Sequence, residues 1–81
     1  MSNPLEWDDF QEKLASYAGL EKGDIRPEMN IYKDLGMDSL GLFSLGMFLM
    51  NTYKVKVPVS AVATIETVGH IFDLMSTGKR M

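Results

Sequence analysis

Residues 34–40 read DLGMDSL and lead directly into the longest uncharged segment of the chain. Gly36 permits a tight turn, and Asp38 is a residue type that favours the N-cap of a helix. Ser39 would then lie in the first turn of that helix, with its hydroxyl at the surface. The start of a helix offers unpaired backbone N–H groups and a partial positive charge. The position therefore suits a phosphate attached to the Ser39 hydroxyl.

The segment that follows predicts a helix from Asp38 or Ser39 to about Tyr53, and no charged residue occurs between Ser39 and Tyr53. At about 100° per residue, Leu42, Leu45, Leu49 and Tyr53 share one narrow face. A neighbouring band on the same helix contains Ser39, Phe43, Gly46, Met47 and Met50. The β-branched, Pro-containing residues 55–59 end this helix, and they could form a short edge strand although no partner strand is evident.

Helical spacing also dominates the two ends of the chain. For the first helix we expect Asn3 as the cap, Pro4 at the first position with Glu6 reaching back to the cap, and Gly19 as the stop. Its apolar face would consist of Trp7, Phe10, Leu14 and Tyr17.

The remaining segments predict a loop, two further helices and a frayed end. Residues 20–37 form a long connection, pinned to the core by Ile25, Met29, Ile31, Tyr32 and Leu35. Ser60 would cap a short helix through Ala63, Thr67 would cap a last helix, and residues 76–80 would fray. The sum is an all-α fold: a small four-helix bundle of three longer helices and one short helix.

Composition limits the class of protein. The chain has 81 residues, no cysteine, one histidine and a net charge of −3. The length predicts one domain over residues 1–81, and the missing cysteine excludes a disulfide scaffold and a thiolate zinc site. The net charge disfavours nucleic acid, and His70 without acidic neighbours predicts no metal site. With no signal peptide and no membrane span in the sequence, we expect a cytoplasmic monomer that binds no membrane.

The stretch 34–40 resembles the attachment motif of acyl carrier proteins, and the order of the predicted helices resembles that family along nearly the whole chain. The resemblance implies that Ser39 is esterified by 4′-phosphopantetheine, which a separate phosphopantetheinyl transferase takes from coenzyme A. Asp38 and Leu40 match flanking positions that the transferase would read. The protein would not be an enzyme. It would carry acyl intermediates as thioesters for fatty-acid, polyketide or related specialised biosynthesis, with loading ligases or synthase enzymes as partners.

The resemblance also implies that an acyl chain can enter the core, where Leu42, Leu45, Leu49 and Ile65 would line its pocket. Fatty-acid carriers have a strongly acidic second helix, whereas here only Asp38 at its start is acidic. We therefore expect Phe43, Met47 and Met50 to form a partner-binding surface that docks mainly through apolar contact.

Two other classes of function stay open at this point. The chain could be a peptidyl or aminoacyl carrier domain, or a non-enzymatic helical interaction domain with an ordinary Asp-Ser cap. A small hydrolase that uses Ser39 with His70 has the least support, because nothing in the sequence provides an oxyanion hole.

Overall fold

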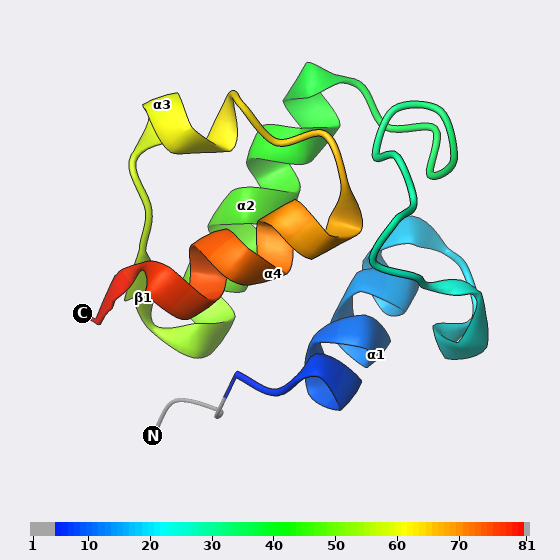
Figure 1. Cartoon of the computed structure of the whole chain (residues 1–81), viewed down its shortest axis with the longest axis horizontal. Coiled ribbons are helices and arrows are strands. Elements are labelled where there is room, and N and C mark those ends of the chain that lie inside the picture. Colours follow the sequence, from blue (N-terminus) through cyan, green and yellow to red (C-terminus); the bar gives the residue numbers. More distant parts are fainter. Residues whose placement is uncertain (1–4, 81) are drawn as a thin grey trace.

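The computed structural model describes residues 5–80, and these residues form a bundle of helices around one apolar core (Figure 1). Its α-helices are α1 (Trp7–Ala18), α2 (Ser39–Tyr53), α3 (Val59–Val62) and α4 (Val68–Thr77). A 3-10 turn, η1, spans Lys22–Asp24, and two short strands, β1 (Val55–Lys56) and β2 (Lys79–Arg80), complete the fold. The predicted arrangement of three longer helices, one short helix and a long first loop is confirmed.

Helix α1 begins later than predicted. Glu6 holds the N-cap position in extended backbone and makes no side-chain capping bond, so the expected role of Glu6 in a capping box is wrong. The predicted cap at Asn3 and first position at Pro4 lie outside the described residues. The predicted stop is confirmed, because Gly19 adopts a left-handed conformation with φ 73°.

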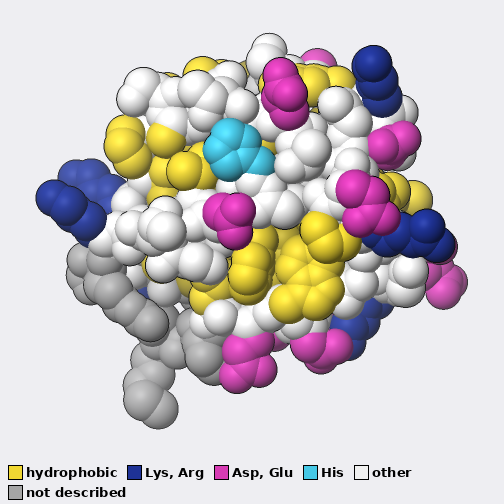
Figure 2. Space-filling view, viewed as in Figure 1, with side chains coloured by type: hydrophobic (Ala, Val, Ile, Leu, Met, Phe, Trp, Pro, Cys, Tyr) yellow, Lys and Arg dark blue, Asp and Glu magenta, His cyan; other side chains and the backbone are white. Residues whose placement is uncertain are grey.

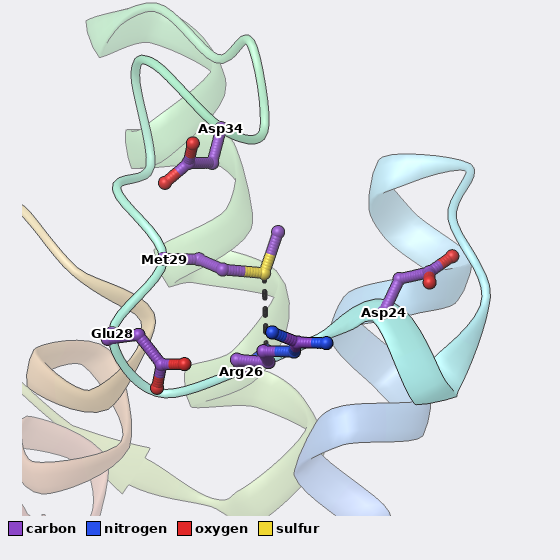
Figure 3. Close-up of a pocket in the computed structure, with 5 residues that line it drawn as sticks. All are labelled: Asp24, Arg26, Glu28, Met29 and Asp34. Atoms are coloured by element: carbon purple, nitrogen blue, oxygen red, sulfur yellow. Dashed lines mark hydrogen bonds between the residues drawn. The ribbon is translucent and has the colours of Figure 1, made fainter.

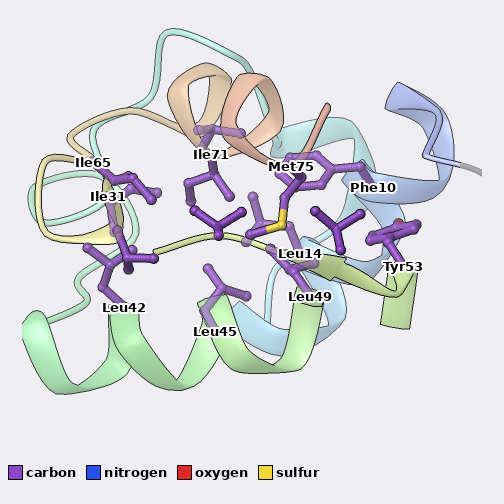
Figure 4. Close-up of a cluster of buried hydrophobic side chains, with 14 of the residues drawn as sticks. Phe10, Leu14, Ile31, Leu42, Leu45, Leu49, Tyr53, Ile65, Ile71 and Met75 are labelled. Atoms are coloured by element: carbon purple, nitrogen blue, oxygen red, sulfur yellow. The ribbon is translucent and has the colours of Figure 1, made fainter. Parts of the chain in front are cut away.

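The buried face of α2 forms the floor of the core (Figure 4). Leu49 projects from it toward Leu14 of α1 and Met75 of α4, whereas Leu42, at the other end of the cluster, projects toward Ile31 and Ile65. All of these side chains are at most 1% exposed. The predicted α1 face is correct for Phe10 and Leu14 but wrong for Tyr17, which is 41% exposed and stacks on Phe48 of α2.

The long loop between α1 and α2 is held by backbone hydrogen bonds to the start of α4. The Ile31 amide donates to the Glu66 carbonyl, the Val68 amide to the Met29 carbonyl, and the Gly69 amide to the Pro27 carbonyl, over 2.8–3.0 Å. Ile25 and Ile31 are buried as predicted, and Met29 and Leu35 pack against the core. Tyr32 does not pin the loop, because it is 39% exposed.

The C-terminal segment is not frayed. Strand β2 pairs antiparallel with β1, with Lys56 opposite Lys79, so residues 55–56 have the partner strand that the sequence did not reveal. Gly78 makes this approach possible, since a Cβ at that position would collide with a methyl group of Val55. The predicted caps of the two preceding helices have different outcomes. Thr67 caps α4 as predicted. Helix α3 begins at Val59 after Pro58, so the predicted cap at Ser60 is wrong.

A single polar contact joins the end of α2 to α1. The Tyr53 hydroxyl, on an otherwise buried ring, donates a hydrogen bond of 2.6 Å to Oδ2 of Asp9. This hydrogen bond, with a smaller contribution from Lys13, lowers the pKa of the Asp9 carboxyl below its ordinary 3.8, while burial and then Asp9 raise the pKa of Tyr53. Asp9 is therefore not simply a solvated residue of α1, because it fixes the far end of the helix that begins at Ser39.

We expect Tyr53→Phe to lower the free energy of unfolding by about 1 kcal/mol at neutral pH, because the hydrogen bond is lost while the ring stays packed. The pKa of Asp9 is lower in the folded state than its ordinary 3.8. The stability that this hydrogen bond contributes is therefore fully present above an ordinary pKa of 3.8 and is lost as the pH falls through the folded-state pKa. Urea unfolding at neutral pH and at about pH 3 measures the difference. Tyr32→Phe, at an exposed ring, is the control and should change little; an equal loss from Tyr53→Phe at both pH values would contradict the assignment.

Candidate functional site

Ser39 is the first residue of α2 and is exposed to solvent, as predicted. Asp38 caps the helix: its Oδ1 accepts a hydrogen bond of 2.7 Å from the Gly41 amide. The Asp38 carbonyl accepts from the Leu42 amide at 2.9 Å and so starts the helical ladder. The amides of Ser39 and Leu40 are first-turn donors without an intrahelical partner, and they lie beside the Ser39 hydroxyl.

A turn at residues 30–34, ahead of Ser39, is held by two polar side chains whose role the sequence analysis did not predict. Oδ1 of Asn30 accepts from the Tyr32 and Lys33 amides at 2.8 and 2.9 Å, and Oδ2 of Asp34 accepts from the Asn30 amide at 2.7 Å. Gly36, with φ 68°, then turns the chain toward Asp38. An Asn four residues before an Asp in a loop is a signal for such a turn, since both side chains favour local bonds to backbone amides.

The predicted pocket residues are the centre of the core. Leu42, Leu45, Leu49 and Ile65 are each at most 1% exposed and belong to one packed cluster. Met75 is buried in the same cluster, and Met29, Met37 and Met50 pack against its edge. The four predicted residues therefore share one interior, surrounded by flexible side chains that can change rotamer.

Of the three residues of the predicted partner surface, one is exposed and two are half-buried. Met47 is 63% exposed, but Phe43 and Met50 are half-buried and pack against the core. The Met50 sulfur is also engaged within the fold, because it accepts a hydrogen bond from the Val57 amide at 3.3 Å. The exposed apolar residues around the start of α2 and α3 are instead Leu40 at 75%, Met47, and Val59 at 68%. Val59 was missed because the predicted short helix, capped by Ser60, began two positions later, which left Val59 in the preceding extended segment.

A further hollow lies along the loop that connects α1 to α2 (Figure 3). It has a volume of about 260 Å³ and is lined by Asp24, Arg26, Glu28, Met29 and Asp34. The Met29 sulfur accepts a hydrogen bond from the Arg26 amide at 3.2 Å across this hollow. Over residues 5–80, no group of three or more His, Cys, Asp or Glu is arranged to hold a metal ion. Asp34 of the 34–40 motif lines the hollow, but Ser39 is not among its lining residues.

The residues around Ser39 fit a phosphate ester. The hydroxyl is exposed, so a bulky group can be attached without displacing the core. Free amides at the helix start can donate to phosphate oxygens. The adjacent surface of α2 presents no carboxylate beyond Asp38, whose Oδ1 is already hydrogen-bonded to Gly41.

No helix among the described residues is long and apolar enough to cross a membrane.

Comparisons with known proteins give matches over most of the chain. A family model described as phosphopantetheine attachment site matches residues 8–75. The acyl carrier protein of Syntrophobacter fumaroxidans is 38% identical over 66 residues, which cover 82% of each chain. The acyl carrier protein of Saccharopolyspora erythraea is 35% identical over 65 residues, 80% of this chain and 68% of the relative.

A solved structure gives the same result for the fold. The structure described as the actinorhodin holo acyl carrier protein from S. coelicolor superposes with a TM-score of 0.71 at 25% identity, covering 96% of this chain and 94% of the other. A family match over most of the chain, relatives above 30% identity and the same helix order agree. The chain belongs to the acyl carrier protein family, whose members carry a covalently attached 4′-phosphopantetheine.

Proposed function

We propose that Ser39 is the residue to which 4′-phosphopantetheine is attached in this acyl carrier. The exposure of Ser39 at the capped start of α2 is the observation that supports this assignment most directly. The family supplies the chemistry of the arm: it ends in a thiol that holds an acyl group as a thioester. The chain has no cysteine, so the arm would be its source of a thiol. As a carrier the protein catalyses no reaction, and its tethered acyl group meets each enzyme at a raised effective concentration.

The side chains beside Ser39 have distinct parts in this proposal. The Asp38 carboxylate fixes the start of α2 through Gly41 and stands next to the modified hydroxyl, where a transferase would contact it. Leu40 is 75% exposed on the other side of Ser39 and offers an apolar contact to the same enzyme. The family's partners are phosphopantetheinyl transferases and synthase enzymes. We propose that this chain binds them as a monomer.

We further propose that the enzymes of the pathway dock on the apolar residues Leu40, Met47 and Val59. Their exposure is unfavourable for an isolated domain, and such groups on a surface mark contact sites. Helix α2 has no charged residue between Ser39 and Tyr53, so charge pairing along this helix cannot provide the contact. An uncharged second helix supports a dedicated carrier of polyketide or related specialised biosynthesis more than a general fatty-acid carrier.

The attachment site is tested by incubating the protein with coenzyme A, magnesium and a phosphopantetheinyl transferase of broad specificity, followed by intact mass measurement. We expect the mass of one phosphopantetheine arm to be added to the wild-type chain. Ser39→Ala should gain none, whereas Ser44→Ala, a serine exposed on the same helix, should be modified like the wild type. A Ser39→Ala chain that still gains the arm would refute the assignment.

The two roles of Asp38 can be separated by comparing Asp38→Ala with Asp38→Asn. Loss of the cap in Asp38→Ala should lower the free energy of unfolding by about 1 kcal/mol, whereas asparagine caps as well as aspartate. If the transferase reads the negative charge, Asp38→Asn should keep its stability but accept the arm more slowly. Thermal unfolding and the rate of mass gain measure the two effects, and equal rates for Asp38→Asn and wild type would leave the cap as the only role.

For the core we propose that long acyl chains insert among Leu42, Leu45, Leu49 and Ile65. Because these side chains are packed together, an inserted chain must displace them. Methyl NMR shifts of these four residues should therefore change between the thiol form and an octanoyl form of the protein. The methyls of Leu20, which is 39% exposed and lies outside the core cluster, are the control. Unchanged shifts at the four core residues would show that the chain stays outside.

A further inference from the structure

The basic residues of the C-terminal half gather at one end of the molecule. Residues 39–81 contain four basic residues, and all of them lie in Lys54–Lys56 or Lys79–Arg80, the segments that form or adjoin the β1–β2 ladder. Lys54 ends α2, and Lys56 and Lys79 are exposed. The edge of the molecule where Figure 1 places β1 and the C-terminus bears a group of basic side chains in Figure 2.

Lys56 and Lys79 face each other directly. They are partners in the antiparallel register, so their side chains leave the ladder on the same side. Like charges in this arrangement oppose pairing. Within residues 5–80 the ion pairs are Lys13–Asp9 and Lys22–Asp8, both made by carboxylates of α1, and neither Lys56 nor Lys79 meets a carboxylate there. The protein thus holds two positive charges together without a described counter-charge.

Lys56 also joins two hollows on the surface. One has a volume of about 440 Å³ and is lined by Lys56, Pro58, Thr77, Gly78 and Lys79. The other has a volume of about 500 Å³ and is lined by Met47, Met50, Asn51 and Lys56. The second hollow follows α2 on the side that bears Ser39, Phe43, Met47 and Met50 in the helical projection. This second hollow, a groove walled by Met47 and Met50 in the second half of α2, therefore ends at Lys56, one of the two facing lysines.

Building on the carrier function, we propose that this groove and the lysine pair dock an acidic patch of a partner enzyme. Apolar side chains of the enzyme contact Met47 and Met50, and its carboxylates pair with Lys56 and Lys79. Charge complementarity selects this occupant, because carboxylates relieve the repulsion across the ladder at the point where the groove ends. Lys54, the C-cap of α2, adds a third positive charge between the helix and β1.

A protein surface fits these observations better than an anionic membrane. The groove is a hollow with methionine walls, which accepts projecting side chains, whereas lipid headgroups bind to flat basic clusters of more residues. The net charge of residues 39–81 is positive, whereas that of residues 1–38, with nine acidic and four basic residues, is negative. An acidic partner is therefore attracted to the lysines of the ladder, at the end of α2 opposite Ser39, which orients the complex along α2.

The test uses the full chain in a selection from a phage library of random peptides, with three variants alongside. They are Ser39→Ala, the double variant Lys56→Glu/Lys79→Glu, and Lys33→Glu. Lys33 is an exposed lysine of the loop between α1 and α2. This loop is hydrogen-bonded to the start of α4, whereas the ladder follows the end of α4. We expect enriched peptides that combine acidic and apolar residues. Their affinity should fall by roughly tenfold or more in the double variant and stay unchanged in Lys33→Glu.

Binding to Ser39→Ala should equal that of the wild type, so the docking surface is tested independently of the attachment of the arm. Single Lys79→Glu should lose peptide binding yet unfold at the same or a higher temperature, because the introduced carboxylate would face Lys56 across the ladder. This combination separates a docking role from a structural one. Vesicles of phosphatidylcholine with about a third phosphatidylserine, and inorganic sulfate, are competitors.

Neutral or basic enriched peptides would overturn the proposal, as would equal affinity for the double variant, which is expected if the lysines only protect the ladder edge from aggregation. Vesicles or sulfate that displace the peptides and bind Lys56 as tightly would assign the site to a membrane or a free anion instead.

Discussion

The hydrogen bond from the Gly41 amide to the Asp38 carboxylate determines where α2 begins, and the exposure of Ser39 follows from it. Were the helix to begin a turn earlier, Ser39 would lie in its interior among amides already bonded to the preceding turn, with no donors free for a phosphate. The buried face of α2 then fixes the rotation of the helix. With Leu42, Leu45 and Leu49 in the core, Ser39 and Met47 must face outward.

Both ends of α2 are joined to other parts of the fold by polar contacts. At its start, the Asn30 and Asp34 side chains shape the turn, and the loop is bonded to the start of α4. At its end, the Tyr53 hydroxyl is bonded to Asp9 of α1. A small domain has a limited apolar core, so such local bonds contribute a large share of what keeps one helix in place. If Ser39 carries the arm as proposed, the attachment point stays on a fixed helix while the arm itself moves.

The sequence alone predicts the parts of this structure that depend on local patterns. The helical spacing of leucines, the Asp38 and Thr67 caps and the Gly19 stop are short-range signals, and all were correct. The β1–β2 ladder was missed because pairing residue 56 with residue 79 depends on the path of α3 and α4 between them. Burial of Phe43 and Met50 was missed for a related reason: helical projection places them on an outer band, but α3 and β1 pack beside that band.

The charge distribution connects these long-range features to function. An uncharged helix beside the arm removes the usual means of orienting a partner, since apolar contact is attractive in many relative orientations. The ladder places positive charge at the end of that helix opposite Ser39, so the helix keeps a direction along which a partner can be oriented. Facing lysines oppose the folding of a domain whose stability is already marginal. Features that oppose folding are found mainly where a surface binds another molecule, and this one adjoins the groove walled by Met47 and Met50.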